Sequence, residues 1–155
     1  MQTLKILLSY CCQNNLSIQQ MDVETAFLNG KIKSDVYVNQ PEGYKKGINK
    51  VYKLLKSLYG LRESPRSWYE CFNDFMNKLG YKRNNYDYCL YIDNKDKDSI
   101  YILLFVDDML ICSKNQKRIN DVKLKLSNRF NMKDIGNVSN YIGINIEFNT
   151  HKEMS

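Results

Sequence analysis

The sequence lacks the side chains and apolar runs that several common kinds of protein require. No stretch of its 155 residues approaches the roughly 20 apolar residues that a membrane span needs. It has a single histidine, His151, close to the C-terminus, which argues against Ser-His-Asp catalysis and against histidine-rich zinc sites. Most of the groups that remain for chemistry are carboxylates.

The number and spacing of the cysteines argue against a protein held together by disulfides. The count is odd, 5, and no two cysteines form a CxxC pair. A disulfide framework is therefore not expected, and a reducing intracellular compartment is favoured. The apolar segment Leu4–Cys12 is a poor signal peptide, because only Lys5 supplies charge near it and no small-residue cleavage site follows. The length fits one domain over residues 1–155.

Positive charge is concentrated in two blocks. The formal net charge is +6, and the first block is interleaved with Tyr52, Tyr59, Trp68 and Tyr69, a mixture that can grip phosphates and stack on bases. The alternative is that both blocks are solvated faces of an ordinary basic domain. The first block contains Lys45, Lys46, Lys50, Lys53, Lys56, Arg62 and Arg66 against Glu63, and the second contains Lys114, Lys117, Arg118, Lys123, Lys125, Arg129 and Lys133 against Asp121.

Hydrophobic spacing predicts helices and strands in mixed order. Helices are expected after Thr3, after Ser64-Pro65, where the hydroxyl caps and the proline takes the first turn, and around 119–130, where the apolar residues fall at helical spacing. Strands are expected at 16–22, 36–38, 51–54, 89–92, 100–105 and 109–112, and an alternating, half-buried strand at 141–148. Because regular βαβ alternation is absent, the fold class is α+β with a mainly antiparallel sheet.

Two adjacent acids, Asp107 and Asp108, interrupt an apolar run from Tyr101 to Cys112. Burying unpaired carboxylates is costly, so the pair either sits in a solvated hairpin turn or is neutralised by cations. Asp22 ends another expected strand. Three carboxylates converging from two strand ends would suit Mg²⁺.

A second acidic cluster competes with this one. Asp93, Asp96 and Asp98 alternate with Lys95 and Lys97 in a polar turn. We interpret this cluster as a solvated turn rather than a calcium site.

Several separated motifs resemble one family in order and spacing. Together they closely resemble the reverse transcriptase (RNA-dependent DNA polymerase) of copia-type LTR retrotransposon Pol polyproteins, over Leu4 to Phe148. The motifs are QMDVETAFLNG at 20–30, VYVNQPEGY at 36–44, LYGLRESPRSWY at 58–69, FVDD at 105–108 and YIGINI at 141–146.

The resemblance implies a polymerase palm with a ferredoxin-like core, and roles for particular residues. Asp22, Asp107 and Asp108 would be the catalytic, metal-binding carboxylates for two Mg²⁺ ions, with Mn²⁺ as an alternative and the Val23 carbonyl as a further ligand. The partners would be an RNA or DNA template-primer, dNTPs and the rest of a Pol polyprotein. The parent element would place the chain in the cytoplasm or in a virus-like particle, with no membrane partner.

Other positions carry nucleotide and nucleic-acid roles by the same resemblance. Phe27 matches the steric gate that disfavours a 2′ hydroxyl, although core packing is the alternative for its ring. Tyr59 and Gly60 would lie along the template and the incoming nucleotide. The nucleic-acid contacts would be Arg62, Arg66, Val106 near the primer end, and Tyr141 and Gly143 in the primer grip, although a plain sheet strand predicts the same alternation. Lys133 is a candidate general acid for pyrophosphate.

The chain also departs from the family pattern. Phe105 stands where the family usually has tyrosine. The chain starts just before the first palm motif and ends before the thumb, so most of the fingers and the thumb would be absent. We therefore expect the isolated chain to be a poor polymerase or an inactive one. A non-catalytic nucleic-acid-binding remnant, or a partial gene product without a selected role, is the alternative.

Overall fold

The structure is a computed structural model that describes residues 2–93 and 98–147. The chain forms two compact units, Met1–Glu24 with Met76–Ser155, and Thr25–Phe75. Each unit is described by itself below.

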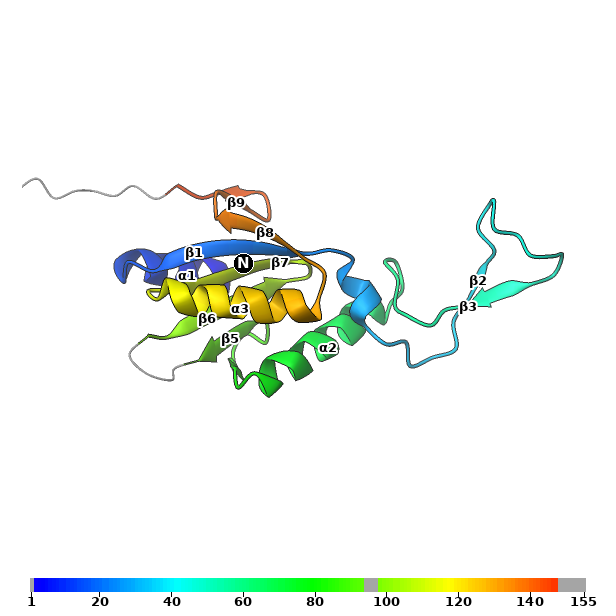
Figure 1. The fold of residues 1–155 in the computed structure, drawn as a ribbon, viewed down its shortest axis with the longest axis horizontal. Coiled ribbons are helices and arrows are strands. Elements are labelled where there is room, and N and C mark those ends of the chain that lie inside the picture. The colour runs from blue at the N-terminus through cyan, green and yellow to red at the C-terminus, as the bar shows by residue number, and fades with distance from the viewer. Residues whose placement is uncertain (1, 94–97, 148–155) are drawn as a thin grey trace, which may run out of the picture. The chain divides into compact units, whose positions relative to one another are not determined.

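The first unit is built on a six-stranded sheet in which every neighbouring pair is antiparallel. The spatial order is β4-β5-β6-β7-β1-β8. This confirms the α+β class with a mainly antiparallel sheet (Figure 1). The strands are β1 (Ser17–Val23), β4 (Lys82–Arg83), β5 (Leu90–Asp93), β6 (Ile100–Phe105), β7 (Asp108–Ser113) and β8 (Met132–Asn137).

Four of these strands have the order of a ferredoxin-like sheet. Along the chain the elements run β1, α2 (Ser64–Lys78), β6, β7, α3 (Gln116–Arg129), β8, while in space the strands lie in the order β6-β7-β1-β8. This is the strand–helix–strand–strand–helix–strand pattern of that fold. The order places β1 and β7 side by side at the centre.

Helices α1 (Gln2–Gln13) and α3 cover opposite faces of this sheet. On α1 the buried residues Leu4, Leu7 and Cys11 pack in one apolar cluster with Ile18 of β1 and with β6 and β7. On α3, the Lys123 side chain donates a hydrogen bond to Gln19 of β1. Because side chains alternate along a strand, Gln19 points to the face opposite that of its neighbour Ile18. The predicted apolar stripe of α3 is confirmed, with Ile119, Val122 and Leu126 buried.

The prediction of a single strand over 141–148 is wrong. The chain instead folds into a tight hairpin of β9 (Asn140–Tyr141) and β10 (Ile144–Asn145). The turn residues Ile142 and Gly143 have φ of 45° and 79°, as a turn that follows the strand twist requires. Alternating side chains suggested one strand, but the glycine permitted a reversal. Phe148 lies outside the described residues.

The structure also corrects the interpretation of the second acidic cluster as a solvated turn. Asp93 and Asp98 are not merely solvated, because both bind the start of α3. Asp93 pairs with Arg118 at 2.7 Å, with side chains 12% and 24% exposed, and Asp98 accepts a hydrogen bond from Asn115 at 2.9 Å. Asp96 lies outside the described residues.

The second unit contains a short 3₁₀ helix η1 (Ala26–Asn29), the hairpin strands β2 (Tyr37–Asn39) and β3 (Val51–Lys53), and the first part of α2. The two predicted strands and the helix start near Ser64 are confirmed. The Ser64 hydroxyl, however, donates to the carbonyl of Leu58 at 2.5 Å. The serine therefore anchors the preceding loop, where we had expected it to cap the helix.

The structure also bears on the expectations about disulfides and about membrane spans. All five cysteines are free. Of the helices in the described ranges, none combines the length and the apolar character that crossing a bilayer demands.

Candidate functional site

Asp22 and Asp108 are direct neighbours across the central pair of strands. Asp22 lies near the end of β1 and Asp108 begins β7, and the two are paired in the antiparallel register. Residues opposite each other in such a pair have Cα atoms about 4.5–5.5 Å apart and project from the same face. The juxtaposition expected from the sequence is present in the fold.

Asp107 comes from the tight turn that joins β6 to β7. Phe105 pairs with Asp108, so only Val106 and Asp107 lie between the strands. The backbone N–H of Val23 donates to the Asp107 carbonyl at 2.9 Å, which ties this turn to the end of β1. The turn is therefore held against the strand that carries Asp22.

Val106 has a φ of 58° and a side chain that is 43% exposed. A β-branched residue in the left-handed region is strained, typically by about 1–3 kcal/mol. The strain is tolerated at a turn that carries Asp107 and leads into Asp108.

Burial and nearby like charge raise the pKa of two of the carboxylates, Asp22 and Asp108. The pKa of Asp22 lies above its usual value because burial disfavours the anion and because Asp107 and Asp108 carry like charge, with Lys133 opposing the shift. The pKa of Asp108 is also raised, by burial and by Asp107, while a hydrogen bond from Gln20 opposes it. A site in which ionised acids disfavour one another attracts a cation.

The donor set fits a hard divalent ion in its chemistry, since carboxylate and carbonyl oxygens are the ligands that Mg²⁺ takes. Within residues 2–93 and 98–147, no three histidine, cysteine or acidic side chains are gathered closely enough to hold a metal ion together. Holding an ion thus requires these side chains to turn toward one another. Their backbone positions allow this, because Asp22 and Asp108 already face each other across the strands.

Three further side chains support the carboxylates. Gln20 lies on the same face of β1 and donates from Nε2 to Oδ1 of Asp108 at 3.2 Å. Lys133 of β8 pairs with Asp22 from its other side. Tyr141 is fully buried, and its hydroxyl donates to the Asp108 carbonyl at 3.3 Å. A fully buried ring cannot stack on a base, so Tyr141 supports the strand below the carboxylates, while Gly143 is exposed in the following turn.

Gln20 and the strand β8 were not predicted from the sequence. Gln20 could have been found, because it stands two residues before Asp22 and alternation puts both on one face. Strand β8, MKDIGN, has no alternating pattern, and its residues form a strand through pairing with β1.

In the second unit, the residues with expected nucleotide roles lie together. The rings of Phe27 and Tyr59 are in contact, with centroids 5.8 Å apart. Tyr59 is 89% exposed, and Gly60 beside it has a φ of 92° with open space where a Cβ would be. Arg62 and Arg66 line a groove of about 420 Å³.

Both basic blocks contain side chains that form ion pairs, and in the first block Lys53 pairs with Asp35 and Arg66 pairs with Glu70. In the second block, Arg118, Lys123 and Lys125 are engaged in ion pairs with acids of the same unit. In the first block, Trp68 is 2% exposed and packs on Phe72, so it is a core residue and does not stack on bases.

Comparison with known proteins gives a consistent result. The family model described as reverse transcriptase (RNA-dependent DNA polymerase) matches residues 1–153. The chain is 40% identical over 149 residues to the retrovirus-related Pol polyprotein from transposon TNT 1-94 of Nicotiana tabacum, covering 94% of this chain and 11% of that protein. It is 34% identical over 144 residues to the Pol polyprotein from transposon RE1 of Arabidopsis thaliana, covering 92% and 10%.

A transposon Ty5-1 protein of Saccharomyces cerevisiae is 34% identical over 137 residues, covering 87% of this chain and 44% of that protein. The chain thus spans less than half the length of these relatives. No solved structure gives a significant match. The family model covers nearly the whole chain, and the chain therefore belongs to the reverse transcriptase (RNA-dependent DNA polymerase) family, in the form found in copia- and Ty-type retrotransposon Pol polyproteins.

Proposed function

We propose that this chain is the palm of an RNA-directed DNA polymerase, which adds dNTPs to a primer 3′ hydroxyl on an RNA or DNA template by two-metal nucleotidyl transfer. The observation that carries the proposal is the register of β1 and β7, which pairs Asp22 with Asp108 beside the Asp107 turn. The palm would act as part of a Pol polyprotein in the parent element, inside the cell.

Asp22, Asp107 and Asp108 would hold the ions, with the Val23 carbonyl as a further ligand. When bound, two Mg²⁺ ions favour deprotonation of the primer hydroxyl and neutralise charge on the leaving pyrophosphate. The chain's own contribution is to position the ligands. Gln20 orients the Asp108 carboxylate, and the Val23–Asp107 hydrogen bond holds the turn.

Lys133 lies opposite Asp22, and its charge partly opposes the rise in the pKa of that carboxyl that burial, Asp107 and Asp108 cause. Its ammonium would keep Asp22 ionised for metal binding and is a candidate proton donor to pyrophosphate. In the second unit, Phe27 would pack against the sugar. The Tyr59 ring contacts the Phe27 ring, and Gly60 would allow close approach of the backbone to the nucleotide. Arg62 and Arg66 would contact phosphates, and Val106 the primer end.

The test combines metal binding with primer extension. Mn²⁺ binding to the full chain is followed by electron paramagnetic resonance, and extension of oligo-dT on poly-rA is followed with Mg²⁺. We expect saturable Mn²⁺ binding that Asp107→Asn weakens by about tenfold or more, because one charged ligand is lost. Asp74→Asn removes the same charge from an exposed position on α2 and is the matched control.

The two readouts separate the possible outcomes. Extension by the parent chain that Asp107→Asn abolishes would support catalysis. Metal binding without extension would leave a palm that needs other parts of its polyprotein. Mn²⁺ binding that is absent, or unchanged in Asp107→Asn, would refute the metal site.

A further inference from the structure

The loop between β2 and β3 has no core of its own. Every residue from Pro41 to Lys50 is exposed. A segment that buries nothing gains little from the hydrophobic effect, so its conformation must be maintained by polar contacts.

One side chain supplies most of these contacts. The Gln40 amide nitrogen donates to the carbonyls of Gly47 and Lys50 at 2.9 and 2.8 Å, and its oxygen accepts from the Lys46 N–H at 2.5 Å. In addition, the Tyr52 hydroxyl donates to the Tyr44 carbonyl at 2.7 Å. The Gln40 side chain therefore orders the loop backbone through these hydrogen bonds. The exposed side chains of the loop are held in a defined arrangement as a result.

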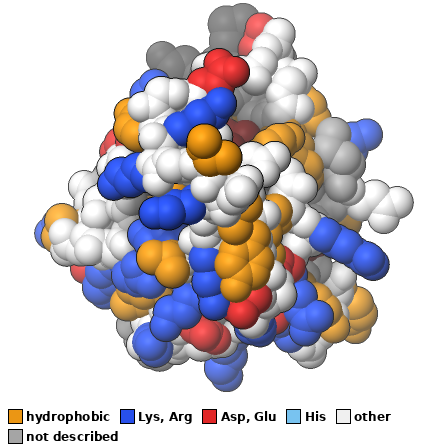
Figure 2. All heavy atoms as spheres, turned by 90° about the vertical axis from the view of Figure 1, so that its right-hand side faces the viewer, with side chains coloured by type: hydrophobic (Ala, Val, Ile, Leu, Met, Phe, Trp, Pro, Cys, Tyr) orange, Lys and Arg blue, Asp and Glu red, His pale blue; other side chains and the backbone are white. Residues whose placement is uncertain are grey.

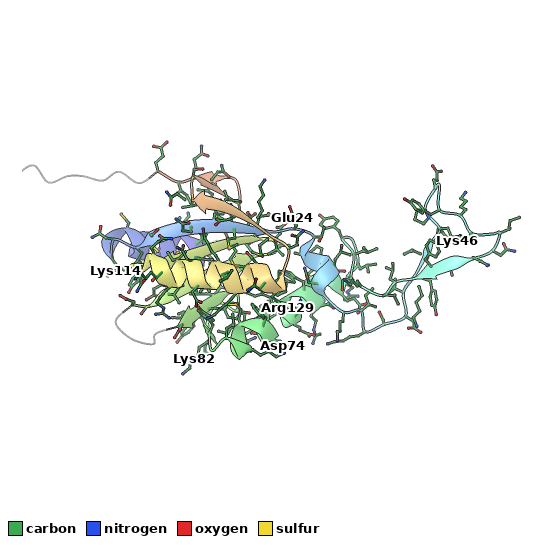
Figure 3. The ribbon with its side chains drawn as sticks, viewed as in Figure 1. Glu24, Lys46, Asp74, Lys82, Lys114 and Arg129 are labelled. Atoms are coloured by element: carbon green, nitrogen blue, oxygen red, sulfur yellow. The ribbon has the colours of Figure 1, made fainter. Side chains whose placement is uncertain are left out.

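The presented side chains are cationic. Lys45, Lys46 and Lys50 stand in the loop with Glu42 as the one acid between Pro41 and Lys50. None of the three forms an ion pair with any residue in the described parts of the chain. Figure 3 labels Lys46 in this loop. Lysine, arginine and hydrophobic side chains are all present on the surface drawn in Figure 2.

Apolar groups accompany the lysines. Tyr44 is 71% exposed and Ile48 is 93% exposed. Exposed tyrosine beside lysine is the combination that binds single-stranded nucleic acid, since the cations contact phosphates and the ring stacks on an unpaired base.

We propose that the β2–β3 loop is a preorganised binding site for single-stranded nucleic acid, in which Lys45, Lys46 and Lys50 contact phosphates and Tyr44 stacks on a base. The proposal rests on the proposed function, because it identifies where that enzyme would hold its unpaired template. Order imposed by Gln40 lowers the entropy that binding must remove. The loop differs from the carboxylate site in needing no metal ion.

The test measures binding of a fluorescein-labelled dT oligonucleotide of 12 nucleotides to the full chain by anisotropy, in EDTA, over a salt series. The combined variant K45A/K46A/K50A should bind about tenfold more weakly, and the slope of log affinity against log salt should fall by about 2, as loss of three phosphate contacts predicts for a single strand. The matched control is K5A/K78A/K82A, which removes three exposed lysines elsewhere.

Two further variants test the other parts of the proposal. Tyr44→Ala should weaken binding while Tyr44→Phe retains it, because stacking needs a ring and no hydroxyl. Gln40→Ala should weaken binding with all lysines still present, because the loop loses its order.

The outcomes are separable from those of the proposed function. The binding assay contains EDTA, so its result does not depend on whether the carboxylates hold a metal ion. The proposal is overturned if the parent does not bind at low salt. It is equally overturned if K45A/K46A/K50A loses no more affinity than K5A/K78A/K82A, a result that would leave the loop to a protein partner.

Discussion

At the scale of single residues, the surroundings of Asp22 make its ionised form unfavourable in the folded protein. Its folded-state pKa is raised, by burial first and by Asp107 and Asp108 next, so the native state binds more protons than the unfolded state just above the usual pKa. Stability therefore falls as pH rises from the usual value through the raised one, and the full penalty is present at neutral pH.

Replacing Asp22 with asparagine should remove this penalty. We expect Asp22→Asn to raise the melting temperature at pH 7 by up to about 4 °C, which corresponds to about 1 kcal/mol in a chain of this size. The gain should shrink as pH falls toward the usual aspartate pKa, because the parent's carboxyl is then neutral as well. Thermal melts of parent and variant between pH 4 and 7 measure this difference.

Glu42→Gln provides the comparison, since this exposed loop carboxylate should show no such gain. A lower melting temperature for Asp22→Asn at pH 7 would contradict the picture of mutually repelling acids. Mg²⁺ gives an independent check: it should stabilise the parent by binding the native state and have less effect on Asp22→Asn.

At the scale of elements, Lys123 links three of them. It projects from α3, is 9% exposed, and binds Gln19 of β1 and Asp134 of β8 at 2.5 and 2.7 Å. The carboxylate that balances this buried ammonium is on the edge strand β8, next to Lys133. The network thus fixes the strand that faces Asp22.

Removing the acid should cost more than removing the base. Asp134→Ala leaves a buried ammonium without its counter-charge, and we expect a loss of about 1–2 kcal/mol, limited because the Asp134 side chain is 54% exposed. Lys123→Met keeps the packing and removes the charge, and should cost under about 1 kcal/mol. Urea denaturation measures both values.

The exposed pair of Lys125 and Asp121 on the same helix is the control. Its side chains are 44% and 55% exposed, so Lys125→Met and Asp121→Ala should each change stability by no more than about 0.5 kcal/mol. The interpretation fails if Lys123→Met proves more costly than Asp134→Ala.

The elements also show what sequence patterns could and could not predict. Strands β5, β6 and β7 lie close to the predicted positions because each is a continuous apolar run, and helix α3 does so because its apolar residues keep helical spacing over the whole element. The pattern misled at 141–148, where alternation continued through a turn that positive φ at Ile142 and Gly143 creates. The hydrophobic pattern did not predict β8, because the strand conformation there comes from pairing with β1 and from the bond between Asp134 and Lys123.

At the scale of the whole molecule, the strand ends alone made Asp22 a candidate neighbour of Asp107 and Asp108, and the family resemblance implied that the three form one site. Local spacing placed each acid at a strand end, whereas the sheet order that makes β1 and β7 neighbours is a long-range property. The supporting contacts of Gln20, Lys133 and Tyr141 depend on that order. For the same reason, local composition could not show that Gln40 orders an exposed loop.

The distribution of burial predicts how stability is distributed over the chain. Amide hydrogen exchange should be slowest in the middle of β7, where Leu110 and Ile111 are fully buried and strands lie on both sides. It should be fastest between Pro41 and Lys50, since exchange there requires only local opening of an exposed loop. Within that loop the amides of Lys46 and Tyr44 should exchange more slowly than the others, because Gln40 and the Pro41 carbonyl accept their hydrogen bonds.

Gln40→Ala tests this distribution, since it removes contacts in the loop and none in the six-stranded sheet. We expect the Lys46 amide to exchange about tenfold faster or more in Gln40→Ala, while the β7 amides keep their parental rates, because local openings in separate cooperative units are independent. Exchange followed by mass spectrometry on peptides covering 41–50 and 108–113 resolves both regions. Faster exchange in β7 as well would mean that the loop and the sheet unfold as one cooperative unit.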